Sequence, residues 1–161
     1  MPTPASRICL LAVVVGACAS HTTNNNSSGD GSSHLDGPVD YKTEGGFIRT
    51  TTSVHVELDG SATKQVTSGA GPTKMTSGTL EAADLDGLRD DIAAVDLKSL
   101  RDSYNCGEFK CGADFPVATL TIAADGTTKQ ILVDRGISDA DLPPGLVTIL
   151  ADLDAIVSKL P

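Results

Sequence analysis

Few side chains in this sequence have the types and spacing that catalysis needs. There is no His-Glu-x-x-His zinc motif, no Gly-x-Ser-x-Gly nucleophile motif and no glycine-rich phosphate loop. His55 is the only histidine of the expected domain, and it falls on the outward face of a strand. Two acidic pairs, Asp84 with Asp86 and Asp139 with Asp141, are spaced like calcium ligands, but neither belongs to a twelve-residue loop ending in glutamate. We therefore predict no catalytic residue, no metal site and no cofactor, and expect that the chain is not an enzyme.

Two of the four cysteines, Cys106 and Cys111, lie five residues apart with Gly107 between them. An even pair in an exported domain is typical of a disulfide, which would close a small ring and stabilise the fold by roughly 2 kcal/mol. A redox pair usually has the spacing Cys-x-x-Cys, and the domain has no second pair of ligands for zinc. We predict a structural disulfide between Cys106 and Cys111.

Export is indicated by the first seventeen residues. Arg7 supplies a positive charge, and a ten-residue apolar run from Ile8 to Ala17 follows it. A membrane-spanning helix needs about 20 apolar residues, so this run is too short to span a bilayer. Its length and flanks fit a secretory signal peptide, which we place at residues 1–17.

The end of this segment, Val15-Gly16-Ala17-Cys18, resembles the lipobox of bacterial lipoproteins. The resemblance implies cleavage between Ala17 and Cys18 and attachment of a lipid to the Cys18 thiol. An ordinary signal peptide followed by a chance cysteine is the alternative. In this family, Ala19 in place of an aspartate favours the outer membrane, so we expect a protein held in the bacterial cell envelope by its lipid.

Residues 18–37 predict a disordered linker between the lipidated Cys18 and the folded domain. They consist almost entirely of Ser, Thr, Asn, Gly and Asp. Such a segment buries too little apolar surface to offset its loss of entropy on ordering. A coil of this length and composition reaches about 25 Å between its ends. We expect a single globular domain over residues 38–161.

The first half of this domain has the alternation of β-strands. The run from Phe47 to Leu58 predicts a long strand with one buried face. The residues on that face are Ile48, Thr50, Thr52, Val54, Val56 and Leu58. Asp59-Gly60 predicts a two-residue hairpin turn to a partner strand over 62–68, and 74–80 predicts a further short strand. A weaker alternation over 39–43 ends at the turn signal Gly45-Gly46.

Two helices and a second hairpin complete the pattern. Apolar residues spaced by three and four predict an amphipathic helix over 82–96. Residues 117–124 and 128–134 predict a hairpin closed by Asp125-Gly126. A final helix begins near Pro143-Pro144, and its apolar stripe is Leu142, Leu146, Ile149, Leu150, Leu153, Ile156, Val157 and Leu160. We predict an α+β fold, with an antiparallel sheet of about four to five strands and two main helices on one face.

Composition excludes one class of partner. The chain has 12 Lys and Arg against 21 Asp and Glu, a net charge of −9, and only 3% aromatic residues. Nucleic-acid binding requires clustered cations for the phosphates, and single strands also require aromatic rings for stacking. We expect no nucleic-acid partner.

A family resemblance gives a more specific expectation. The sequence Tyr41-x-x-x-Gly45-Gly46-Phe47, followed by a strand, a leucine-rich helix, a loop with Asp114, a hairpin and a proline-led helix, resembles the emfourin-type family. Members of that family are small proteinaceous inhibitors of thermolysin-like metallopeptidases. The resemblance covers about residues 39–160, and its only local motif is the Gly-Gly-Phe turn. It carries over no contact residue, but we predict that an exposed turn, either that of Gly45, Gly46 and Phe47 or the loop over 69–73, blocks a peptidase cleft.

Two functions remain open at this point. The first is a lipid-anchored, non-enzymatic binding module that inhibits or sequesters an exported peptidase. The second is a structural or assembly lipoprotein of the outer membrane, which docks a protein partner through an uncovered face of its sheet. Both expect a membrane partner through the lipid and a protein partner through the domain.

Overall fold

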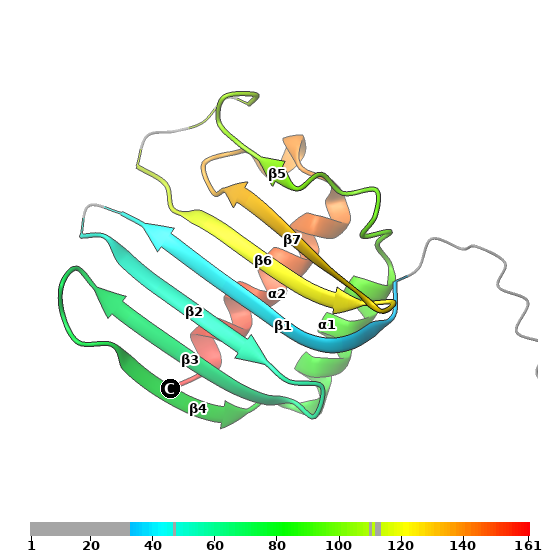
Figure 1. Ribbon diagram of the computed structural model, residues 1–161, viewed down its shortest axis with the longest axis horizontal. Coiled ribbons are helices and arrows are strands. Elements are labelled where there is room, and N and C mark those ends of the chain that lie inside the picture. Colours follow the sequence, from blue (N-terminus) through cyan, green and yellow to red (C-terminus); the bar gives the residue numbers. More distant parts are fainter. Residues whose placement is uncertain (1–32, 47, 110, 112–113) are drawn as a thin grey trace, which may run out of the picture.

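The computed structural model describes residues 33–46, 48–109, 111 and 114–161. These residues form one sheet whose helices lie on a single face, so that Figure 1 views the opposite, open face. The elements are β1 (Leu35–Gly45), β2 (Thr50–Val56), β3 (Ser61–Ser68), β4 (Lys74–Thr79), α1 (Ala82–Ala93), β5 (Ser103–Tyr104), β6 (Val117–Ala124), β7 (Thr127–Asp134), the 3₁₀ turn η1 (Asp139–Asp141) and α2 (Pro144–Lys159). No helix in the described part of the chain is long and apolar enough to cross a bilayer.

The sheet has the strand order β4-β3-β2-β1-β6-β7-β5. Every neighbouring pair is antiparallel except β5 and β7, which are parallel. The predicted α+β class, with two main helices on one face, is confirmed. The prediction of four to five strands is wrong, because the sheet has seven.

The undercount has two physical causes. Strand β1 lies at the centre of the sheet, although its sequence alternates only weakly, because its neighbours β2 and β6 provide pairing along both edges. Strand β5 is two residues long, and no periodicity can be recognised over two residues. Its partner β7 positions it, and that pairing depends on the tertiary fold.

The folded domain begins earlier than Pro38. Strand β1 starts at Leu35, where it pairs with Ala124. Before it, the Ser33 hydroxyl is buried and donates to the carbonyl oxygen of Val95 at 2.8 Å, while the backbone N–H of Leu97 donates to the same hydroxyl oxygen. The polar composition of residues 33–37 therefore conceals an ordered segment, since its polar groups bind the fold. The rest of the predicted linker and the signal peptide, 1–32, lies outside the described residues.

The two Asp-Gly dipeptides form different turns. Asp125 and Gly126 form the predicted two-residue connection, and both have positive φ, 53° and 69°. Asp59-Gly60 instead ends a four-residue connection, because β2 stops at Val56 and the N–H of Glu57 donates to the carbonyl oxygen of Ser61. The prediction of a two-residue turn there is wrong.

The core lies between the sheet and the two helices. Alternate residues of the strands enter it, among them Val39, Val54, Leu120 and Ile131, and each helix contributes its apolar stripe. All residues of the stripe predicted for α2 are buried except Val157, which is partly buried. Ile48 and Leu58 were predicted to be buried but are exposed, because β2 covers only Thr50–Val56 and both residues lie in connections beyond its ends.

A polar cluster joins the central strand to α2. The Tyr41 hydroxyl donates to one carboxylate oxygen of Asp154 at 2.6 Å, and Arg135 donates to the other. Tyr41 is 2% exposed, and its burial together with the Asp154 carboxylate raises the pKa of the phenol above its usual range. The phenol therefore stays protonated and donates to the carboxylate, which fixes α2 against β1.

Candidate binding surface

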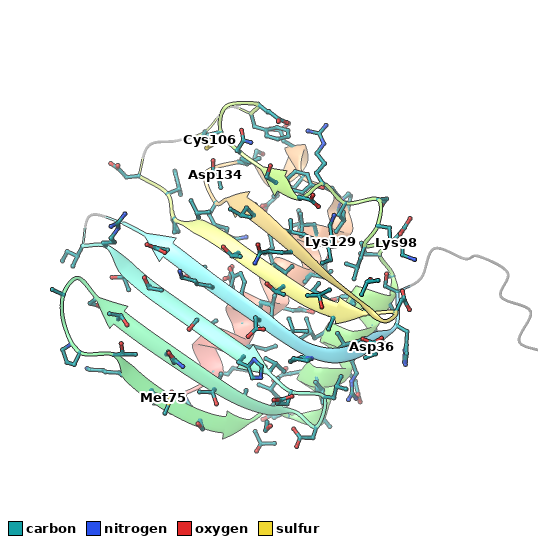
Figure 2. All side chains as sticks on the ribbon, viewed as in Figure 1. Asp36, Met75, Lys98, Cys106, Lys129 and Asp134 are labelled. Carbon is teal, nitrogen blue, oxygen red and sulfur yellow. A yellow bond between two sulfur atoms is a disulfide. The ribbon has the colours of Figure 1, made fainter. Side chains whose placement is uncertain are left out.

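The open face of the sheet is polar at its centre. Antiparallel pairing places residues from successive strands in rows, because paired residues point to the same side. One row runs across six strands as Ser77, Thr63, His55, Asp40, Thr121 and Gln130. The next row contains Met75, Gln65, Ser53, Lys42, Thr119 and Leu132. Figure 2 shows side chains standing on the strands of this face, in front of the helices.

His55 is held between two carboxylates on this face. Its Nδ1 lies 2.7 Å from Oδ1 of Asp40, and its Nε2 lies 3.0 Å from Oε1 of Glu57. The hydrogen bonds to Glu57 and then to Asp40 raise the pKa of His55. Both ring nitrogens of His55 therefore already have a carboxylate as hydrogen-bond partner.

Two shallow depressions adjoin on the open face. The larger has a volume of about 510 Å³ and is lined by the central rows around His55 and Asp40. The smaller, of about 340 Å³, lies toward the β1–β2 turn and combines the charged Lys42, Glu44 and Arg49 with the apolar Val117 and Leu132. Lys42 and Thr119 border both depressions. The open face thus changes from polar to partly apolar toward one end of the sheet.

The loops at that end contact one another. The β1–β2 turn and the β3–β4 loop lie side by side on the left of Figure 1, and the N–H of Gly69 donates to the carbonyl oxygen of Arg49 at 3.0 Å. Gly45 approaches the segment before β6 so closely that a Cβ there would lie 2.6 Å from Cα of Pro116. The N–H of Arg135, after β7, donates to the carbonyl oxygen of the same proline at 2.9 Å.

Exposed apolar side chains gather at this end of the sheet or on the adjoining open face. Of the six large hydrophobic residues that are exposed in the described part of the chain, five belong to this set, and only Leu58 lies at the opposite end. The five, which we call the loop-end surface, are Ile48, Met75, Phe115, Val117 and Leu132. Ile48 and Met75 are the most exposed, at 68% and 67%. Apolar side chains exposed along one end of a sheet offer surface that a partner can cover.

The predicted binding turn lies beside this surface. Gly45 and Gly46 both have positive φ, and Gly46 at 85° adopts a conformation that other residues rarely take. The two glycines are therefore explained by the turn itself and by the contact with Pro116. Phe47, the third predicted binding residue, lies outside the described residues. No contact of this turn with a partner follows from the backbone, so its binding role stays a prediction.

The predicted cysteine pair lies at the same end. The Sγ atoms of Cys106 and Cys111 are 2.05 Å apart, which is disulfide distance, and this part of the prediction is confirmed. The N–H of Cys106 donates to the Asp134 carboxylate at 2.7 Å, and Cys111 forms a β-bridge with Ile137. These two contacts join the disulfide loop after β5 to the end of β7 and to the residues that follow it. Ala17 and Cys18 lie outside the described residues, so their roles stay predictions.

The acidic pairs have structural partners. Asp84 accepts a hydrogen bond from Lys159 at 2.6 Å, which links α1 to the end of α2. Asp139 and Asp141 belong to the turn η1, which is capped by the hydroxyl of Ser138. Within the described residues, no three His, Cys, Asp or Glu side chains are grouped in a way that could hold a metal ion.

One carboxyl on the helix layer has an altered affinity for protons. Burial and the neighbouring Asp91 carboxyl raise the pKa of Asp152 to about 6, from an ordinary value of 3.8. Protonated Asp152 therefore stabilises the folded state fully below pH 3.8, and this contribution is lost as the pH rises through 6.

Asp152→Asn should remove this pH dependence. Because asparagine stays neutral beside Asp91, we expect the variant to be more stable than the wild type above pH 6, with little difference below pH 3.8. Asp152 is only partly buried, so solvent screening limits the gain at neutral pH to about 1 kcal/mol or less. Urea unfolding across this pH range measures it. Asp90→Asn, on the exposed side of α1, is the matched control, and an Asp152→Asn profile parallel to the wild type would contradict the assignment.

Sequence patterns missed most of the open-face site. Alternation could place Asp40 and His55 on the outward sides of their strands, but their contact depends on the register in which β1 pairs with β2. The loop-end surface was also missed, because Phe115 and Val117 are separated from Ile48 by more than sixty residues. The one available signal was the large apolar side chain of Phe115 in a loop next to Pro116.

Comparison with known proteins adds no assignment. No protein-family model matches this sequence, and no curated protein is similar to it at a significant level. The resemblance to the emfourin-type family therefore depends only on the residues quoted for it.

Proposed function

We propose that this protein is a lipid-anchored, non-enzymatic binding module of the bacterial cell envelope, and that its protein partner docks on the loop-end surface. The observation that carries the proposal is the gathering of five of the six exposed large hydrophobic residues on one end of the sheet. Exposed apolar side chains at loops that the fold holds in place can bury surface on docking with little loss of entropy.

The architecture supports a rigid docking element. The β1–β2 turn and the β3–β4 loop share a hydrogen bond, and the segment before β6 contacts Gly45. The Cys106–Cys111 disulfide lies in a further loop at the same end. Loops that project from a sheet and are cross-linked to one another can enter a cleft without rearrangement, which is how many protein inhibitors act on peptidases.

An exported peptidase is the partner that we propose. The loop-end surface combines apolar side chains with Lys42, Glu44 and Arg49, so it offers both an anchor and charges that orient the partner. Figure 2 shows Met75 near the start of β4, beside the same projecting loops. A metallopeptidase of the thermolysin type is the specific class implied by the Gly45-Gly46-Phe47 resemblance.

Inhibition assays test this proposal. The purified protein is titrated into a panel of thermolysin-like peptidases, and we expect dose-dependent loss of cleavage at micromolar concentration for at least one of them. Ile48→Asp should weaken that inhibition by about tenfold or more, because it places a charge at the most exposed apolar position. Leu58→Asp is the matched control, since Leu58 is also exposed but lies at the opposite end of the sheet. Unchanged cleavage across the panel would remove inhibition as the function.

The open face favours a second candidate, a structural or assembly lipoprotein. The polar depression of about 510 Å³ spans several strands and could receive a polar segment of an envelope protein. In pull-downs from envelope extracts, this function predicts scaffold proteins and not peptidases. Thr121→Arg, in the row of His55, should reduce such capture, whereas Ile48→Asp should leave it unchanged.

A further inference from the structure

The two edge strands of the sheet differ in the number of backbone groups that they leave without a partner strand. Strand β5 forms one edge, but it is only two residues long and continues into the disulfide loop. Strand β4 forms the other edge over six residues, and Figure 1 shows no described segment beyond it. A free edge of this length presents backbone groups that a further strand can bind.

The register identifies these groups. The N–H of Leu80 donates to the carbonyl oxygen of Gly60, so these two residues form a hydrogen-bonded pair of the β3–β4 ladder. Hydrogen-bonded and non-hydrogen-bonded pairs alternate along an antiparallel ladder. The backbone N–H and C=O groups of Met75, Ser77 and Thr79 therefore point away from β3, toward the free edge.

From Met75 to Thr79, strand β4 lacks the features that usually protect an edge. Natural edge strands carry charged residues or proline, or are interrupted by a bulge. From Met75 to Thr79 there is neither charge nor proline, and the pairing with β3 is regular. Lys74, at the first position, is the only charged residue of the strand.

We propose that β4 pairs with β4 of a second copy of this chain, which joins two sheets edge to edge around a twofold axis. A twofold axis at Ser77 lets the outward-pointing backbone groups of all three residues form hydrogen bonds. It places Ser77 opposite Ser77 of the second copy and Met75 opposite Thr79 of the second copy. Each Met75, exposed on its own, then gains a neighbour across the interface.

The charge distribution favours a second copy of the chain as the partner of β4. The same register places Lys74 opposite Leu80 of the second copy, so the two lysines lie at opposite ends of the interface and do not meet. The chain carries a net charge of −9, which opposes most contacts between two copies, whereas β4 itself carries one positive charge. The β4 edge is therefore a place where two copies can meet without carboxylates of the two strands opposing one another.

Sedimentation of the purified full chain tests the proposal. We expect a concentration-dependent dimer, and Ser77→Lys should raise its dissociation constant at least about tenfold, because two ammonium groups then meet at the twofold axis. Gln65→Lys is the matched control: it adds the same charge on the same face, one strand further from the edge, and should leave the dimer intact. A monomer at every concentration, or a dimer that Ser77→Lys leaves unchanged, would overturn the proposal.

A second variant keeps the test independent of folding defects. Residues opposite one another in a hydrogen-bonded pair have Cα atoms about 5.5 Å apart, a separation that a disulfide can bridge. Ser77→Cys should therefore form a disulfide between two copies on oxidation, which peptide mass spectrometry identifies as a link between the two residues 77. Gln65→Cys should not. Failure of Ser77→Cys to cross-link in a folded, dimeric sample would place the interface elsewhere.

Discussion

Replacement of Cys18 by serine is expected to abolish lipid attachment. In the proposed lipidation, the acceptor is the Cys18 thiol sulfur, which is far more nucleophilic than a hydroxyl oxygen when it is deprotonated. The lipobox resemblance implies that the lipidated Cys18 becomes the new N-terminus, so we expect cleavage to fail without the lipid. The variant should therefore keep residues 1–17 and show complete loss of labelled fatty acid.

Intact mass and fatty-acid labelling measure this effect. The wild-type protein should begin at Cys18 and carry the mass of its acyl chains, each methylene of which contributes about 0.8 kcal/mol to membrane binding. Cys9→Ser is the matched control, because Cys9 lies inside the apolar run and should not affect processing. A wild-type product that begins at an unmodified Met1 would exclude the lipoprotein assignment.

Gly145→Ala is expected to destabilise the domain, although alanine is the better helix former. Gly145 lies in the first turn of α2, and a Cβ there would come within 2.3 Å of Cγ2 of Val95. Val95 is buried and β-branched, so its side chain cannot move aside without strain. We expect a loss of about 1–3 kcal/mol in the free energy of unfolding, measured by urea denaturation.

Two further variants separate packing from helix propensity. Gly87→Ala, in the middle of α1, meets no atom within 4 Å and should stabilise the domain by about 0.5–1 kcal/mol. Combining Gly145→Ala with Val95→Ala should recover part of the loss, because the clashing methyl group is gone. If Gly145→Ala proved as stabilising as Gly87→Ala, the close approach between the two segments would be wrong.

The fold could be predicted wherever the determining interactions are local. The apolar stripes of α1 and α2 and the Asp125-Gly126 hairpin depend on residues close in sequence, and they were found within a few positions. The sequence could not show that β1 lies at the centre of the sheet, because β1 pairs with β6, about eighty residues later. The order of Ser33 also depends on a distant partner, the carbonyl of Val95.

The same division applies to the candidate site. The pairing of Cys106 with Cys111 follows from a spacing of five residues, so it could be predicted. The hydrogen bond of His55 to Asp40 depends on the register of the sheet. The location of Ile48 and Phe115 at the same end of the sheet depends on the arrangement of its loops. Surfaces that several distant segments build together are therefore visible only in three dimensions.

The position of β1 affects how the domain responds to mechanical load. Whatever pulls on the chain ahead of Ser33 enters the fold at a strand that is paired on both sides, with β2 and with β6. From Val39 onward, a pulling force cannot peel β1 off an edge and must break hydrogen bonds to both neighbouring strands. In the proposed lipid-anchored protein, a load between the membrane and a bound partner would therefore act on the central strand of the sheet.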